Sequence, residues 1–246
     1  MSSSDFDFID TVSRADSVDA LHAVCADLCE DYGFDRFIYG ARIPTSFVKP
    51  YFIFISGYPK EWRDHYTRKN YMIVDPTVEY CARSVTPLCW DGKSELGTGT
   101  PEVQRFMSEA HDFGLNSGVS FPLHTAQGDF AMLSFASEKL GVSTPSLQRV
   151  LPIGQLFTAY LHESVRRVFA SDVLTLSKVD LTGREKECLL WATEGKTAWE
   201  TSQILSIAER TVTFHLQNVQ HKLGVNNRQQ AVARAVSLGI IEPQFG

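Results

Sequence analysis

Aromatic side chains with polar tips gather around one carboxylate in the first half of the chain. They are Tyr58, Trp62, Tyr66 and Trp90, and the carboxylate is Asp75. Trp62 and Tyr66 are four residues apart, so on a helix they project from the same face. Large aromatic rings can wall an apolar cavity, and an indole N–H or a phenol O–H can orient the polar head of a ligand. The alternative is an aromatic core whose polar tips are satisfied internally, and composition alone favours that alternative.

A second set of polar side chains lies near the C-terminus. Residues 209–223 predict a helix, because Val212, Leu216, Val219 and Leu223 recur at helical spacing and form one apolar stripe. The other face carries side chains of the types that reach the phosphates and base edges of DNA. These candidate DNA-binding residues are Arg210, Thr211, Thr213, His215, Gln217, Asn218, His221 and Lys222, followed by Arg228. A small helical bundle with a solvated polar face is the alternative.

Three further helices are predicted around this one. Thr182 and Glu185 form a capping-box pattern that begins a helix, which Gly195 ends. Residues 197–205 and 229–238 predict the other two. Because only the short turn at residues 206–208 separates the second helix from the polar one, the segment has the geometry of a helix-turn-helix. We therefore expect an all-α, four-helix domain over residues 181–246, preceded by a linker at residues 171–180.

Both strands and helices are predicted in the part of the chain that must position the aromatic cluster. Helical spacing or capping signals mark five segments, and Asp75-Pro76 is an N-cap followed by proline at the first helical position. The predicted helices span residues 17–32, 59–69, 76–83, 101–113 and 144–169, and the predicted strands span residues 37–43, 51–56, 119–124 and 130–136. Pro152 is expected to kink the last helix or to mark its true start. The fold class is α+β, with an N-terminal α/β/α sandwich around a central antiparallel sheet over residues 1–170.

Composition and charge exclude several classes of protein. The chain has 246 residues, of which 43% are hydrophobic and 21% charged, so it is neither disordered nor fibrous. It contains no stretch of roughly 20 apolar residues and begins without a signal-peptide pattern, and its five cysteines are scattered, so we expect a reduced, cytoplasmic location and no membrane contact. The net charge is −7 for residues 1–176 and +1 for the remainder. Four cations and no acidic residue lie between Arg210 and Arg234, which suits a segment that meets phosphate.

Two other functions are disfavoured by the residues. A phosphate-receiving domain needs acidic residues at the end of its first strand, and Ala41-Arg42-Ile43-Pro44 contains none. An enzyme is disfavoured because the chain has no Gly-x-Ser-x-Gly motif and no nearby pair of His or Cys with metal-ligand spacing. We therefore expect no catalytic residue, no metal site and no cofactor.

The C-terminal segment resembles the DNA-binding domain of LuxR-type regulators. The resemblance rests on Leu181-Thr-Gly-Arg-Glu185, Gly195-Lys-Thr197, Ser206-Ile-Ala-Glu-Arg-Thr-Val212, His215 and Lys222-Leu-Gly-Val225. The N-terminal segment resembles the autoinducer-binding domain of the same family. That likeness rests on Trp62-x-x-x-Tyr66, Asp75-Pro-Thr-Val78 and Trp90, and is closest to the LasR branch.

The resemblance implies that the regulatory ligand is an N-acyl-homoserine lactone. Trp62 would donate its indole N–H to the lactone carbonyl, and Asp75 would accept the amide N–H. Tyr58 and Ser134 would bond the acyl carbonyl, and Trp90 would pack on the lactone ring. A buried Asp75 fits this role, because an isolated buried carboxylate is costly unless a donor reaches it.

Three more positions follow from the same resemblance. Tyr66 would line the tunnel for the acyl chain, Thr77 would lie near the head group, and Arg63 could reach a 3-oxo group through water. The implied partners are double-stranded DNA with an inverted-repeat operator, a second copy of the chain in a homodimer, and RNA polymerase. The helix at residues 145–169 would pair across the two-fold axis, and the whole would control quorum-sensing genes. An orphan regulator of the same architecture with a changed or promiscuous ligand is the alternative.

Overall fold

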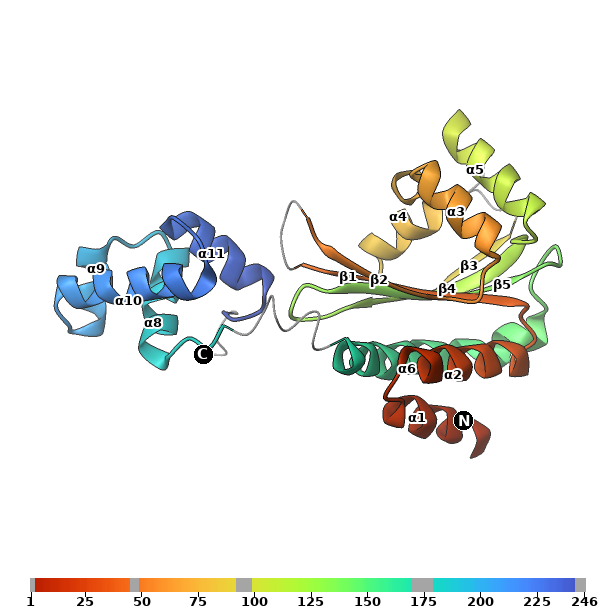
Figure 1. Ribbon diagram of the computed structural model, residues 1–246, viewed down its shortest axis with the longest axis horizontal. Helices are drawn as coiled ribbons and strands as arrows, with labels where there is room; N and C mark the ends of the chain where they lie inside the picture. Colours follow the sequence, from red (N-terminus) through yellow and green to blue (C-terminus); the bar gives the residue numbers. More distant parts are fainter. Residues whose placement is uncertain (1–2, 45–48, 92–98, 170–178, 242–246) are drawn as a thin grey trace. The chain divides into compact units, whose positions relative to one another are not determined.

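The computed structural model describes residues 3–44, 49–91, 99–169 and 179–241, with side chains from residue 7 onward. The chain forms two units, the first mainly within residues 1–170 and the second mainly from residue 171 onward. Most of the linker expected at residues 171–180 lies outside the described residues, so its character stays a prediction. Each unit is considered separately below (Figure 1).

The first unit is built on a five-stranded sheet with the strand order β2-β1-β5-β4-β3. The β1–β5, β5–β4 and β4–β3 pairs are antiparallel, and Ser134 of β5 lies opposite both Ile38 of β1 and Ser120 of β4. The strands are β1 (Arg36–Ile43), β2 (Tyr51–Ser56), β3 (Leu88–Asp91), β4 (Ser117–His124) and β5 (Phe130–Ser137).

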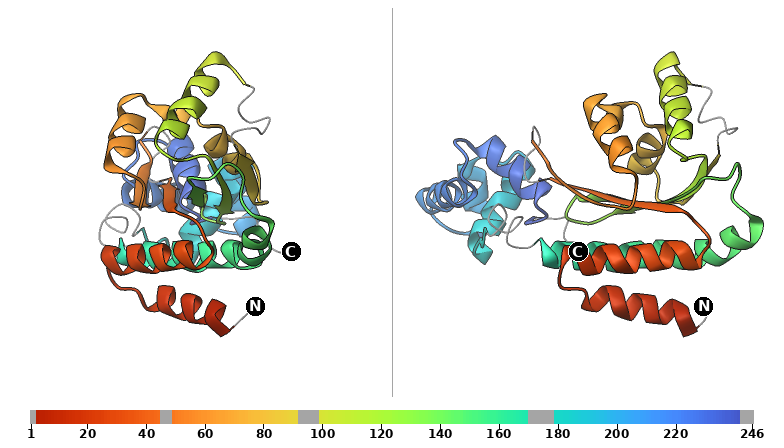
Figure 2. Two further views of the ribbon diagram at one scale, coloured as in Figure 1. Left: turned by 90° about the vertical axis from the view of Figure 1, so that its right-hand side faces the viewer. Right: turned by 45° about the vertical axis from the view of Figure 1, so that its right-hand side comes forward.

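Helices cover both faces of this sheet, as the sandwich prediction requires. Helices α1 (Ser3–Arg14), α2 (Val18–Asp31) and α6 (Thr144–Val168) lie on one face. Helices α3 (Lys60–Arg68), α4 (Pro76–Arg83) and α5 (Pro101–Asp112), with the short 3-10 helix η1 (Tyr71–Ile73), lie over the other (Figures 1 and 2). The fold class expected from the sequence is confirmed.

The two faces of the sheet differ in side-chain size because successive strand residues point to opposite sides. On the α6 side, Phe121 and Phe135 are fully buried and their rings meet edge to face at 6.2 Å. On the α3–α5 side, Gly118 and Ser120 of the same strand leave room. Large residues thus build the core on one face, and small residues permit a hollow on the other.

Helix α6 crosses the sheet closely. Its N-cap is Ser143, and it runs through Pro152, so Pro152 does not mark its start. Gly154 is the point of closest approach, since a Cβ there would lie 2.2 Å from the ring of Phe121.

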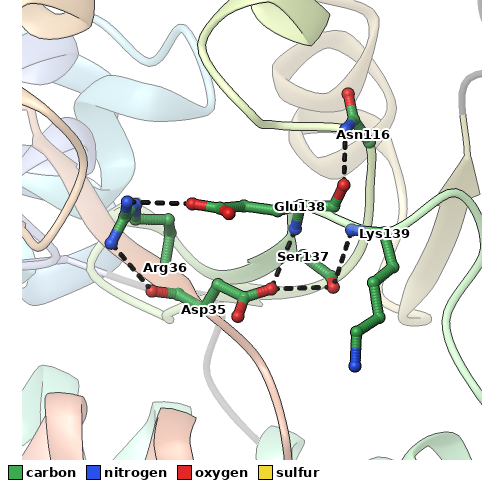
Figure 3. Close-up of polar contacts among 6 residues, drawn as sticks. All are labelled: Asp35, Arg36, Asn116, Ser137, Glu138 and Lys139. Atoms are coloured by element: carbon green, nitrogen blue, oxygen red, sulfur yellow. Dashed lines mark hydrogen bonds and ion pairs between the residues drawn. The ribbon is translucent and has the colours of Figure 1, made fainter.

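A cluster of polar contacts links three strands at one end of the sheet (Figure 3). Asp35 accepts hydrogen bonds from the Ser137 hydroxyl and the Glu138 backbone N–H, both at 2.9 Å. Arg36 pairs with Glu138 at 3.0 Å, and the Asn116 amide donates to the Glu138 carbonyl at 2.6 Å. These contacts tie the start of β1, the approach to β4 and the end of β5 together, and so hold the register of three strands.

The second unit consists of four helices in the part of the chain that is described: α8 (Gly183–Thr193), α9 (Ala198–Leu205), α10 (Glu209–Leu223) and α11 (Arg228–Ser237). Thr182 with Glu185 and Thr197 with Glu200 both form complete capping boxes. The expected stripe of Val212, Leu216, Val219 and Leu223 is buried in the core of this unit. Ser206 adopts a left-handed conformation (φ 52°) that ends α9 and turns the chain toward α10.

Three elements were not expected from the sequence: α1, η1 and β3. Among the described residues, no helix has both the length and the apolar character that crossing a membrane requires.

Gly154→Ala should lower the free energy of unfolding of the first unit. Alanine normally stabilises a helix interior by about 1 kcal/mol over glycine. Here the added methyl group collides with the buried Phe121 ring, and such overpacking costs about 1–3 kcal/mol. Denaturant unfolding measures the change. Gly183→Ala on α8, where a Cβ meets nothing within 4 Å, is the matched control and should cause no loss. Equal stability of Gly154→Ala and the wild type would contradict the tight crossing.

Candidate ligand cavity and DNA-recognition helix

A cavity of about 460 Å³ lies between the sheet and helices α3, α4 and α5. Its wall includes every ligand-binding residue proposed from the sequence. These are Tyr58, Trp62, Arg63, Tyr66, Asp75, Thr77, Trp90 and Ser134. The structure therefore brings together residues that come from α3, α4, β3 and β5 and are up to 76 positions apart. Their roles toward a ligand stay predictions.

Asp75 is the acidic residue among the described residues of the cavity wall, and its two oxygens accept different hydrogen bonds. Oδ1 caps α4 by accepting the backbone N–H of Thr77 at 2.8 Å and of Val78 at 3.4 Å. Oδ2 accepts the Tyr66 hydroxyl at 3.0 Å. Burial raises the pKa of Asp75, and these hydrogen bonds oppose the shift. A carboxylate oxygen can accept more than one hydrogen bond, so Oδ2 can take a further donor from inside the cavity.

The two cavity tyrosines keep their protons. Burial raises the pKa of Tyr58 and of Tyr66 well above the ordinary value, and the charge of Asp75 adds to both shifts. Both phenols are therefore hydrogen-bond donors at neutral pH. Tyr66 uses its proton to hold Asp75, a contact that the tunnel-lining role expected for it did not include.

Trp62 is held by other aromatic rings. It is 2% exposed, and the rings of Tyr66, Tyr71, Phe106 and Phe113 lie 5.2–6.3 Å from its own. None of the described residues accepts a hydrogen bond from its indole N–H. This donor sits in an apolar cluster at the cavity wall, where an acceptor on a ligand would satisfy it.

Trp90 is placed differently from Trp62, because its indole N–H already has an acceptor. It donates to the Ser120 hydroxyl at 3.1 Å, and Ser120 lies 2.7 Å from the Ser134 hydroxyl. Gly118 allows the ring to lie flat on the sheet, since a Cβ there would come within 2.4 Å of it. The Trp90 ring can therefore pack against a ligand but cannot donate to it while this bond persists.

Sequence reasoning missed Ser120 and the network that braces α3 against α5. Ser120 could have been found from the run Gly118-Val-Ser-Phe121, in which small residues alternate with larger apolar ones as in a strand with two different faces. In the brace, Glu109 of α5 bonds His65 of α3 at 2.6 Å and also accepts the Tyr71 hydroxyl. His65 in turn stacks on Trp62. No local sequence pattern indicates these contacts, because Glu109 lies 38 positions from Tyr71 and 44 positions from His65.

The rest of the cavity wall is mostly apolar and includes residues of the edge strand β2. Phe52 and Phe54 stack there at 6.2 Å and are 41% and 52% exposed. Arg42 lies over the Phe130 ring at 5.8 Å, and Arg63 is exposed at the α3 side. The wall thus combines a few polar groups, Asp75 among them, with a mostly apolar lining.

In the second unit, α10 carries the expected polar face. Arg210, Thr211, Thr213, Gln217 and His221 are exposed, and His215 and Asn218 are half-buried. Sequence reasoning missed the exposed Phe214 in the middle of this face and the exposed Trp199 and Ile204 on α9.

The cationic groups of Lys222 and Arg228 both have bonding partners within the second unit. Lys222 forms an ion pair with the buried Glu185 at 2.7 Å and donates to the Asp180 carbonyl at 3.0 Å. Burial acts to raise the pKa of Glu185, but the hydrogen bonds from Lys222 and Thr182 outweigh it and the pKa is lowered. Arg228 donates to the Lys196 carbonyl. Their contact with DNA stays a prediction, and these partners point to a positioning role.

Lys222→Met should destabilise the second unit and leave the salt dependence of DNA binding unchanged. Glu185 loses its ion-pair partner, which costs about 1–3 kcal/mol of unfolding free energy. A lysine that bound phosphate would instead reduce the slope of log affinity against log salt by about 1. Lys186→Met, on the exposed face of α8, is the control for stability. A reduced slope at unchanged stability would show that Lys222 binds phosphate.

Family models match both parts of the chain. Residues 17–165 match the autoinducer binding domain, and residues 179–235 match the bacterial regulatory proteins of the luxR family. The chain is 35% identical to the transcriptional activator protein AnoR of Acinetobacter nosocomialis, over 91% of this chain and 92% of that one. It is 36% identical to the transcriptional activator protein LuxR of Aliivibrio fischeri, over 96% and 94%.

Among solved structures, Escherichia coli SdiA matches with a TM-score of 0.81 at 26% identity, over 98% of this chain and 99% of that one. A particular likeness to the LasR branch stays a prediction. The chain belongs to the LuxR family and is a ligand-dependent quorum-sensing transcription regulator, with an autoinducer-binding domain followed by a helix-turn-helix DNA-binding domain.

Proposed function

We propose that the regulatory ligand is an N-acyl-homoserine lactone and that it binds in the cavity around Asp75. The observation that carries this proposal is a buried carboxylate with unused acceptor capacity, facing an unpartnered indole N–H in a mostly apolar chamber. An acyl-homoserine lactone combines an amide N–H for Asp75, a lactone carbonyl for Trp62 and an apolar chain for the apolar part of the cavity. No other cofactor and no enzymatic turnover are part of the proposal.

The remaining cavity residues orient the ligand. The Tyr58 and Ser134 hydroxyls donate to the acyl carbonyl, and the Trp90 ring packs on the lactone. Thr77 lies next to the head group and Tyr66 holds Asp75 in place. Arg63, at the exposed end of the wall, reaches a 3-oxo group through water.

DNA binding then depends on a dimer. Two copies pair through α6, whose outer face exposes Leu156 and Tyr160. A two-fold dimer places two α10 helices in successive major grooves about 34 Å apart, so the operator is an inverted repeat. Arg210, Thr211, Thr213, His215, Gln217, Asn218 and His221 face the DNA, while Lys222 and Arg228 hold the domain together.

The regulator acts as an activator in the cytoplasm, where the bacterial chromosome lies. The relatives named above are transcriptional activators, and activation requires a surface for RNA polymerase. Trp199 (59% exposed) and Ile204 (43% exposed) on α9 are exposed apolar side chains that a protein partner would cover.

A second ligand class has one observation in its favour. A solved structure with a TM-score of 0.81 and 26% identity is SdiA in complex with octanoyl-rac-glycerol. A glycerol ester lacks an amide N–H but offers hydroxyl donors to Asp75. An orphan regulator with such a ligand would keep the same architecture.

Ligand binding should stabilise the folded protein and raise its affinity for DNA. A ligand that binds only the folded chain adds about 2.7 kcal/mol at one hundred times its dissociation constant. Melting temperature, operator affinity and sedimentation are measured with a panel of acyl-homoserine lactones and with octanoylglycerol. We expect one acyl-homoserine lactone to raise the melting temperature and to give a dimer on operator DNA.

Trp62→Phe keeps the ring and removes the donor, so this lactone should bind about 5- to 150-fold more weakly, equivalent to 1–3 kcal/mol. Trp191→Phe, in the second unit, is the matched control. A response to octanoylglycerol alone would favour the second ligand class. No change with any compound would refute the cavity as a signal site.

Lactone affinity should fall as the pH is lowered from neutral toward the raised pKa of Asp75. The ionised carboxylate accepts the ligand N–H and the protonated one does so poorly, so ligand binding favours the deprotonated form. Asp75→Asn should bind more weakly at neutral pH and lose this pH dependence. Asparagine can still cap α4, so this variant removes the charge of residue 75 without removing the helix cap. Titrations over a pH series give the result, with Asp112→Asn, an exposed carboxylate on α5, as the control. An equally steep profile for Asp75→Asn would contradict the assignment.

A further inference from the structure

Phe214 points directly away from the core of the second unit. It lies two residues from Val212 and from Leu216, both buried, and two residues turn an α-helix by about 200°. Its side chain is 57% exposed and is absent from the hydrophobic core of the unit. The ring contact found for it is with the adjacent His215, at 5.9 Å. Folding therefore gives no reason for a phenylalanine at this position.

The surroundings of Phe214 are polar and cationic. Arg210, Gln217, Asn218 and His221 lie three, four or seven residues away, on the same side of α10. No acidic residue occurs between Arg210 and Arg234. The charge of this surface suits a polyanion, and an apolar ring stands at its centre.

The chemistry of the major groove leaves one main partner for such a ring. The base edges exposed there are hydrogen-bond donors and acceptors, apart from the C5-methyl group of thymine. We propose that Phe214 packs on a thymine methyl group in each half of the operator and so selects thymine at that position. This inference rests on the proposed DNA binding through α10 and adds the base that one residue reads.

Uracil substitution tests the contact, because deoxyuridine differs from thymidine only by that methyl group. An operator is first selected from random DNA with the full-length, ligand-bound protein. Each thymine is then replaced by uracil, one at a time, on both strands. We expect one position per half-site where uracil weakens binding about four-fold, and about fifteen-fold when both half-sites are changed, as for about 0.8 kcal/mol per buried carbon group.

Two variants assign the effect to the ring. Phe214→Ala should bind the thymine and uracil operators equally, whereas Trp199→Ala, an equally exposed aromatic on α9, should keep the discrimination. Phe214→Leu, which retains an apolar group, should keep part of it. Because Phe214 lies outside the core, the melting temperature of Phe214→Ala should match that of the wild type.

The outcomes separate this inference from the proposed function. If the wild-type protein selects an operator but binds every uracil version as tightly, the thymine contact is refuted and DNA binding stands. The same holds if Phe214→Ala discriminates as the wild type does, since another residue then reads the methyl group. If no operator can be selected with any ligand of the panel, the proposed function itself fails.

Discussion

The unmet hydrogen-bonding capacity of one buried carboxylate organises the first domain. Asp75 begins α4 through one oxygen and holds Tyr66 of α3 through the other, so the helices on that face of the sheet converge on it. Burial disfavours its charge, and each hydrogen bond restores part of the loss. Oδ2 keeps capacity to accept one more hydrogen bond on the wall of the cavity. The carboxylate thus joins the packing of the helices to the polar character of the cavity.

Trp62 and Trp90 have the same side chain but differ in how each is held and in the hydrogen bond of the indole N–H. Trp90 has its N–H satisfied by Ser120 and is fixed against the sheet over Gly118. Trp62 is fixed by rings, and its N–H has no acceptor among the described residues. The Trp90 N–H is thus occupied within the protein, whereas the Trp62 N–H has no acceptor among the described residues. The distinction depends on small residues in β4, which also keep the cavity face of the sheet hollow.

Local patterns in the sequence predicted most elements, because helix caps and strand alternation are properties of neighbouring residues. Pairing between distant segments was harder to predict. Strand β3 has four residues, too few to show a period, and it is defined by its pairing with β4. The cavity set was reached through the resemblance of Trp62, Tyr66, Asp75 and Trp90 to a known family. Ser120 and Glu109 were missed since their partners lie far away in the chain, and the ion pair of Lys222 with Glu185 was not expected for the same reason. The assignment of Lys222 to the DNA face stays a prediction.

The stacked Phe52 and Phe54 on β2 have a consequence for the association of this protein with other chains. They belong to an edge strand, where unpaired backbone groups and exposed apolar rings occur together. Such an edge is a template for pairing with another polypeptide. Pairing of this sheet with another chain is therefore favoured at β2.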